Sequence, residues 1–194
     1  MIAFIRGSFV RKTAASVVVD VNGVGYELHI SLNTYTAIAN LDKGQLHTYF
    51  HVREDAQILF GFAEESEKEL FIQLINVSGV GASTARMMLS SMKPAELTRA
   101  IVGSNSKQLE SIKGIGKKTA ERIVLELRDK LGKTSHPEIN TVLTDNTLHH
   151  DALNALTALG IARATAEQAL ARVQKTNPEL QKIEDLIKSA LKNI

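Results

Sequence analysis

The feature that most constrains the fold is an internal repeat in the middle of the chain. Shifted by 35 residues, "LINVSGVGASTARMMLSSM" (74–92) lies over "LESIKGIGKKTAERIVLEL" (109–127). Both copies carry Gly-aliphatic-Gly, and apolar residues before and after it recur at helical spacing. Each copy therefore predicts a helix, a tight glycine turn and a second helix. Two such units can bury their apolar faces against each other in one compact domain.

The glycine turns predict a site for phosphate. Glycine permits unusual φ and has no Cβ, so a bulky anion can approach the main chain. The next residues open a helix, whose first N–H groups are unpaired and lie at the positive end of its dipole. Such contacts bind phosphates and do not read base edges. The candidate DNA-binding residues are Gly79, Val80, Gly81 and Ser83 in the first copy, and Gly114, Ile115, Gly116, Lys117, Lys118, Thr119 and Arg122 in the second.

The two copies differ in charge. Lys117 and Lys118 follow the second turn, whereas Ala82 and Ser83 stand at the corresponding positions of the first, which should bind the more weakly. The net charge is only +2, but residues 107–133 carry eight Lys or Arg against four acids. A polyanionic partner should therefore meet the middle of the chain.

Nucleotide sites are excluded at the second turn. A P-loop needs a glycine at position 111 and Ser or Thr at position 118, where the chain has Ser111 and Lys118. A dinucleotide fingerprint needs a third glycine at position 119, where the chain has Thr119, and a preceding strand, where the pattern is helical. Glycines that only make tight corners between helices are the plainer alternative, but two copies in register favour DNA. The composition also allows a helical module that binds only proteins.

The first 62 residues have the period of β-strands. Apolar residues alternate in the opening "IAFIRGSFV" and in the later runs, which are 16–21, 26–31, 45–52 and 57–62. Asn22-Gly23, between the second and third runs, is a strong signal for a two-residue hairpin. A short helical stretch, "LNTYTAIAN", precedes the fourth run. Five strands with a helix between the third and fourth is the order of an OB-type barrel.

The predicted fold class is a multidomain α+β protein. Its domains are an OB-type β-barrel at 1–63, a central helical domain with the two repeats at 64–133, a flexible linker at 134–148 and a three-helix bundle at 149–194. The linker prediction rests on a stretch with no Lys or Arg, one Pro and no helical period. Asn177-Pro178 predicts the start of the last helix.

Catalytic, metal and cofactor sites are not expected. The chain has no Cys, and neither His47 with His51 on one strand nor His149 with His150 in the linker has a convergent carboxylate. The stretch after the second repeat leaves no room for the base-flipping pocket of a glycosylase, and aromatic residues make up only 5%. With no signal peptide and no apolar run of about 18 residues, we expect a cytoplasmic protein without a membrane span.

The repeat resembles the helix-hairpin-helix pair of DNA-binding proteins. With the barrel and the tail, "GVGYE" (23–27), "VREDAQ" (52–57) and "GIGKKTAER" (114–122) make the whole chain similar to the RuvA family. These are bacterial Holliday-junction-binding subunits of the branch-migration machine. The resemblance implies a non-catalytic homotetramer, single or as two stacked tetramers, that binds four-way junction DNA in recombination and repair. It also implies a hexameric RuvB-type ATPase as partner, and a RuvC-type junction resolvase as a further one.

The resemblance gives roles to two further groups of residues. Glu54 and Asp55, which alone would be read as a solvated turn, would meet at the centre of the tetramer as an acidic pin that repels duplex arms. Leu156, Leu159 and Ile161 would contact the ATPase. The alternative function is a general helix-hairpin-helix DNA-binding module without preference for junctions.

Overall fold

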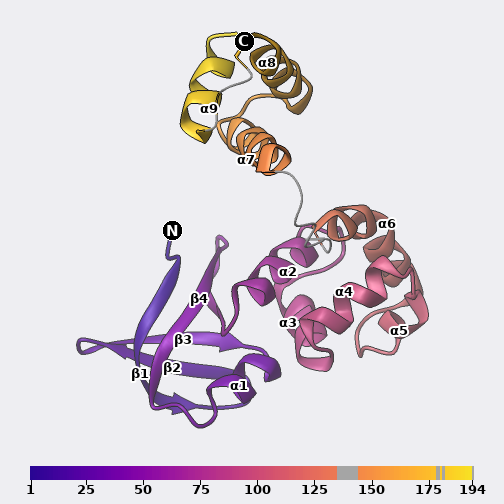
Figure 1. The fold of residues 1–194 in the computed structure, drawn as a ribbon. Coiled ribbons are helices and arrows are strands. Elements are labelled where there is room, and N and C mark those ends of the chain that lie inside the picture. Colours follow the sequence, from indigo (N-terminus) through magenta and orange to yellow (C-terminus); the bar gives the residue numbers. More distant parts are fainter. Residues whose placement is uncertain (135–143, 178–179, 181, 194) are drawn as a thin grey trace. The chain divides into compact units, whose positions relative to one another are not determined.

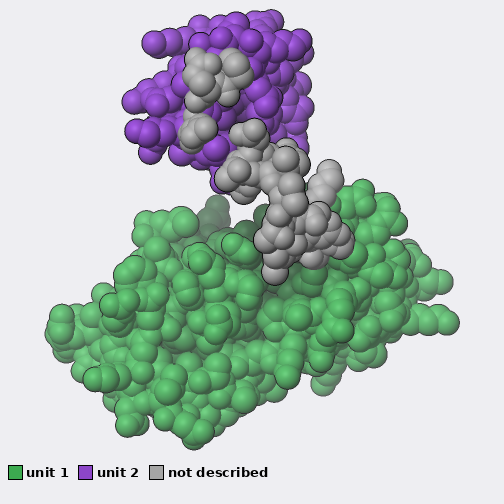
Figure 2. Space-filling model, in the orientation of Figure 1, with its two compact units in different colours: residues 1–137 green, residues 138–194 purple. Residues whose placement is uncertain are grey.

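The computed structural model describes residues 1–134, 144–177, 180 and 182–193. The chain forms two compact units, residues 1–137 and 138–194 (Figure 2). The first unit contains the strands and the central helices, and the second contains the C-terminal helices (Figure 1). Within the described ranges, we find no helix long and apolar enough to cross a membrane.

A closed β-barrel begins the first unit. Its strands are β1 (Phe4–Lys12), β2 (Ser16–Val21), β3 (Val24–Ile30), β4 (Lys43–Val52) and β5 (Gln57–Phe62), and helix α1 (Leu32–Ile38) lies between β3 and β4. The order around the barrel is β1-β2-β3-β5-β4, with β3 and β5 parallel. The alternating apolar side chains fill the barrel, among them Val17, Val19, Leu28 and Leu46, all fully buried. The OB-type prediction is confirmed.

The turn between β2 and β3 explains why Asn-Gly is found there. Asn22 and Gly23 both have positive φ, at 53° and 90°. A two-residue turn of this hand matches the twist of the strands that it joins, and Asn and Gly adopt it at least cost. The side chain of Asp20 fixes the turn by accepting a hydrogen bond from the Gly23 amide at 2.7 Å.

The central helices share one apolar core. They are α2 (Glu65–Ile75), α3 (Ala82–Ser91), α4 (Pro94–Val102), α5 (Ser106–Glu110) and α6 (Lys117–Thr134). Equivalent positions of the two repeats are fully buried in this core, namely Leu74 with Leu109, Ala85 with Ala120, and Met88 with Ile123. Helix α4 begins at Pro94 and is capped by Gly103. The predicted double repeat is confirmed.

A buried carboxylate joins the barrel to the central helices. Glu67, in the first turn of α2, is only 2% exposed. Its Oε1 accepts a hydrogen bond from the Ser31 hydroxyl and its Oε2 accepts one from Thr34 Oγ1 at 2.7 Å. Burial raises the pKa of this carboxyl, and the two hydroxyl donors act against that rise. Glu67 therefore ties α2 to α1.

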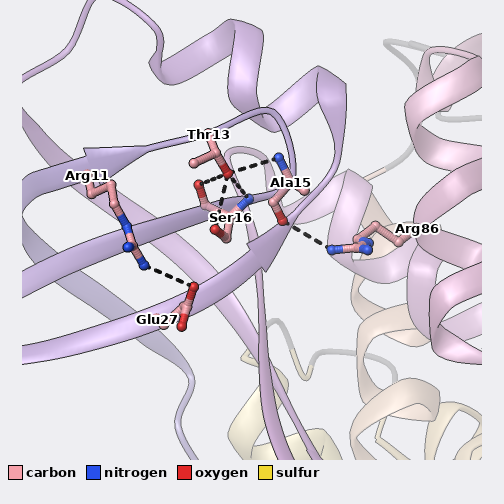
Figure 3. Close-up of polar contacts among 6 residues, drawn as sticks. All are labelled: Arg11, Thr13, Ala15, Ser16, Glu27 and Arg86. Carbon is pink, nitrogen blue, oxygen red and sulfur yellow. Dashed lines mark hydrogen bonds and ion pairs between the residues drawn. The ribbon is translucent and has the colours of Figure 1, made fainter.

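Helix α3 is also tied to the barrel (Figure 3). Arg86 Nη1 donates to the carbonyl oxygen of Ala15 at 3.1 Å, in the turn between β1 and β2, and lies 3.2 Å from His29 Nδ1. Thr13 braces that turn, since its hydroxyl oxygen accepts from the Ser16 amide at 2.9 Å. The Asn33 side chain of α1 donates to the Leu89 and Met92 carbonyls at the end of α3. The first repeat is thus held by the barrel at several points.

The described part of the second unit is a small bundle of helices. These are α7 (Thr144–Ala158), α8 (Arg163–Thr176) and α9 (Ile183–Leu191). Leu156, Leu170 and Val173 are fully buried at its centre. This confirms the predicted three-helix bundle, though two of its predicted boundaries are wrong.

The two corrections concern the starts of α7 and α9. Helix α7 begins at Thr144, so residues 144–148 are helix and not linker, and His149 and His150 lie in α7. Leu148 stands four residues before Ala152, which extends the apolar spacing of the helix backwards. Helix α9 begins at Ile183, and Asn177 instead ends α8, where its amide donates to the Val173 carbonyl at 2.8 Å. Residues 135–143 of the predicted linker and Pro178 lie outside the described residues.

Candidate nucleic-acid interface

The two glycine turns have the same backbone conformation. Gly79 and Gly114 have positive φ, at 90° and 89°. The backbone hydrogen bonds of the two turns also match. Within each turn the central aliphatic amide donates to a carbonyl three residues earlier at 3.0 Å, Val80 to Val77 and Ile115 to Ile112. At the start of each following helix an alanine amide donates to a glycine carbonyl at 2.9 Å, Ala85 to Gly81 and Ala120 to Gly116. The sequence repeat is therefore also a structural repeat.

The central aliphatic residue of each turn points into the protein. Val80 is 4% exposed and Ile115 is 5% exposed, and both belong to the central core. Their amides already donate to Val77 and Ile112. The side chains and amides of Val80 and Ile115 are therefore already engaged within the protein, and a DNA contact at either residue stays a prediction. A glycine turn needs an apolar residue to fix it to the core, and these residues serve that purpose.

The glycines on either side remain at the surface. Gly79, Gly81, Gly114 and Gly116 are all exposed, and a Cβ added at any of them would meet no atom within 4 Å. Gly81 is the N-cap of α3, with extended backbone. The first helical amides have no carbonyl four residues earlier in their own helix. These positions offer N–H groups to solvent at the positive ends of α3 and α6.

The predicted polar residues lie around these turns. Lys117 and Lys118 are exposed in the first turn of α6, and Thr119 behind them is half-buried. Ser83 is exposed in the first turn of α3. The second turn therefore has two cations beside its exposed amides, whereas the first turn of α3 has none.

Arg122 has a role that the sequence did not indicate. Its Nη1 donates to the carbonyl oxygen of Ser78 at 3.1 Å and lies 3.2 Å from the Ser78 hydroxyl. Ser78 directly precedes the first glycine turn, so Arg122 links the second repeat to the first. No local pattern reveals a contact between residues 44 positions apart.

A cavity of about 390 Å³ lies between the barrel and the first turn. It is lined by Gly81, Ala82 and Ser83 on one side and by barrel residues on the other, namely His51, Arg53, Asp55, Ala56, Ile58 and Phe60. The barrel thus contributes charged side chains next to the first amides of α3. These two segments lie far apart in the sequence, and no shared pattern connects them.

Glu54 and Asp55 are exposed in the turn between β4 and β5. The Arg53 amide donates to the Ala56 carbonyl at 2.8 Å and closes this turn. Two adjacent carboxylates therefore stand at the tip of a short, well-defined hairpin.

The predicted ATPase contacts divide between surface and core. Leu156 is fully buried, because a bundle of this size needs it in the core, and its role as an ATPase contact stays a prediction. Ile161 is half-buried against the same core, whereas Leu159 is 64% exposed. Gly160, with φ of 88°, ends α7 between them. Of the three, only Leu159 presents a large apolar surface.

Two matching glycine turns that open helices beside a shared core define a tandem helix-hairpin-helix domain, here joined to an OB-type barrel. A model of the "SAM-like Helix-hairpin-helix tandem" matches residues 71–129, one of the RuvA N-terminal domain matches 1–61, and one of the RuvA C-terminal domain matches 147–194. The chain belongs to the RuvA family.

Full-length relatives agree with the family models. The chain is 44% identical to the Holliday junction branch migration complex subunit RuvA of Cytophaga hutchinsonii, over 99% of both chains. It is 43% identical to the protein of the same description from Christiangramia forsetii, and 41% identical to that from Bacteroides fragilis, each over 100% of both chains.

Proposed function

We propose that this protein binds four-way junction DNA without reading its sequence and takes part in branch migration during recombination and repair. The observation that carries the proposal is the pair of matching glycine turns with exposed amides. Amides at helix N-termini bind phosphate oxygens, which are the same in every DNA sequence. The relatives are Holliday junction branch migration complex subunits, which supports the junction as the substrate.

The proposed assembly is a homotetramer. Around a fourfold axis, Glu54 and Asp55 of each subunit would form a ring of carboxylates. Like charge repels phosphates, so this acidic pin would keep duplex arms from the centre and guide separated strands outward. Exposed apolar side chains on the barrel supply surface for subunit contacts, among them Phe4 at 53% and Val10 at 66%.

The chain supplies no catalytic group in this proposal. A hexameric ATPase of the RuvB type would drive the DNA arms, and the C-terminal bundle would dock it, with the exposed Leu159 as the candidate contact. A RuvC-type resolvase would act on the same junction.

The experiment compares a four-way junction with a linear duplex of equal length in a gel shift with excess competitor DNA. The proposal predicts retention of the junction at protein concentrations that leave the duplex free. Equal weak binding to both would favour the alternative, a general helix-hairpin-helix module. A scrambled junction sequence should bind as tightly as the first one.

A further inference from the structure

We propose that Arg53, a residue of the barrel, provides the phosphate-binding cation of the first helix-hairpin-helix turn. It would hold a backbone phosphate of DNA in the cavity that it shares with Gly81, Ala82 and Ser83. The inference rests on the proposed function and adds to it a DNA contact from outside the hairpins. The ligand is a phosphodiester group.

The first turn lacks a cation of its own. Helix α3 opens with Ala82 and Ser83, where α6 opens with Lys117 and Lys118. The first basic residue of α3 is Arg86, and its Nη1 is bonded to Ala15 of the barrel (Figure 3). Arg122 bonds Ser78 and does not line the cavity. At the first turn, backbone amides alone must therefore bind the phosphate unless another part of the protein supplies a positive charge.

Arg53 lies where that charge is needed. It lines the cavity opposite the N-terminus of α3, at the end of β4. Phosphate between these two sides would meet the positive end of the α3 dipole and a guanidinium together. Guanidinium groups bind phosphate through two parallel N–H bonds and keep their charge at any physiological pH.

The side chain is held in place while its outer donors stay available. Arg53 Nε donates to His51 Nε2 at 2.8 Å, and the Arg53 amide is bonded to Ala56. The His51 ring packs against Phe60, with ring centres 6.3 Å apart. Among the described residues, Nη1 and Nη2 of Arg53 have no acceptor, and Arg53 forms no ion pair with Asp55 in the same cavity. Protein contacts therefore orient the guanidinium and leave its two outer nitrogens able to donate to phosphate.

The test measures the salt dependence of junction binding by full-length protein. Removing one phosphate contact flattens the slope of log K against log salt by about 0.9 on duplex arms. Arg53→Gln should do so, whereas Lys43→Gln, which removes the same charge at the other end of β4, should leave the slope unchanged. Adding Ser83→Lys to Arg53→Gln should restore the slope, because the cation then comes from α3 itself. Ser91→Lys, at the far end of α3, should not restore it.

Two results separate this inference from the proposed function. If Lys118→Ala flattens the slope and Arg53→Gln does not, the function stands and Arg53 is not a contact. If neither substitution changes the slope, the glycine turns do not bind DNA and both proposals fail. Mass photometry of each variant keeps a changed oligomeric state from being mistaken for a weakened DNA interface.

Discussion

Arg122 Nη1 lies 3.1 Å from the carbonyl oxygen of Ser78, a residue 44 positions earlier in the chain. The bond runs from the second helix of the second hairpin to the start of the first turn. The distance between the two glycine turns therefore depends on a side chain as well as on the shared core. A hydrogen bond from a charged donor makes this link stronger than a neutral one.

Replacing Arg122 should loosen the two hairpins. Because the guanidinium is exposed, we expect Arg122→Ala to lower the free energy of unfolding by only about 0.5–1 kcal/mol. Junction affinity should fall several-fold, since the two sites are no longer held at one spacing. Urea denaturation and junction titration measure the two effects. A flattened salt slope with unchanged stability would instead make Arg122 a direct phosphate contact.

Lys118 should contribute a direct phosphate contact. We expect Lys118→Ala to flatten the salt slope by about 0.9 for each phosphate that the lysine neutralises in the wild type. Ser83→Ala, at the equivalent position of the first turn, should scarcely change it. Lys175→Ala, an exposed lysine of α8, serves as the control for simple removal of charge. A slope equal to that of the wild type would remove Lys118 from the interface.

The two glycines of a turn should respond differently to alanine. Gly79 has φ of 90°, which a residue with a Cβ adopts at a cost of roughly 1–2 kcal/mol, so Gly79→Ala should destabilise the protein by about that amount. Gly81 has φ of −85°, which any residue adopts. Gly81→Ala should therefore keep the stability within about 0.5 kcal/mol but weaken junction binding, since its Cβ occupies the approach to the amides. Thermal unfolding and titration separate the two cases.

Glu67 should make stability depend on pH. Its pKa is raised in the folded state, because burial disfavours the charged form. The protonated carboxyl is therefore the better tolerated form in the folded protein. The stability that it contributes is complete below the ordinary pKa of 4.5 and is lost as pH rises through the raised pKa. The stability of the wild type relative to Glu67→Gln should fall across that window and then level off. Urea denaturation between pH 4.5 and pH 8, using both proteins, measures it, and a constant difference would contradict the prediction.

Substitutions at Leu159 and Leu156 should have different effects, one on docking of the ATPase and the other on folding of the C-terminal bundle. Leu156→Ala leaves a hole in a small core and should cost about 2–5 kcal/mol, which is enough to unfold the bundle. Leu159→Ser changes an exposed side chain and should keep the helical circular dichroism while it weakens stimulation of a RuvB-type ATPase. Full stimulation by Leu159→Ser would move the docking surface elsewhere.

Local patterns were enough to predict most of the fold. The alternation in the strands, Asn22-Gly23 and the repeat each act within a few residues or within one helix face, so they can be read from the sequence. Local patterns did not tell which apolar residues are buried in the core and which are exposed. The pattern Gly-aliphatic-Gly does not tell that Val80 is fixed in the core, and the apolar character of Leu156 suits a core as well as a contact surface.

Contacts between distant segments could not be read from the sequence. Glu67 looks like an ordinary acid of a first helical turn until Ser31 and Thr34 are brought to it by the barrel. Arg53 likewise reads as a turn residue until the fold sets it beside Gly81. Such polar contacts carry no periodicity, and only the packed structure reveals them.

The central claim is that the amides of the glycine turns bind the DNA backbone. The chain has 12 glycines, so selective ¹⁵N-glycine labelling of the full-length protein gives a simple amide spectrum. On adding a four-way junction, we expect the signals of Gly79, Gly81, Gly114 and Gly116 to shift, equally for two junctions of unrelated sequence, while Gly160 stays in place. Unmoved signals for these four glycines, with shifts confined to others, would contradict the account.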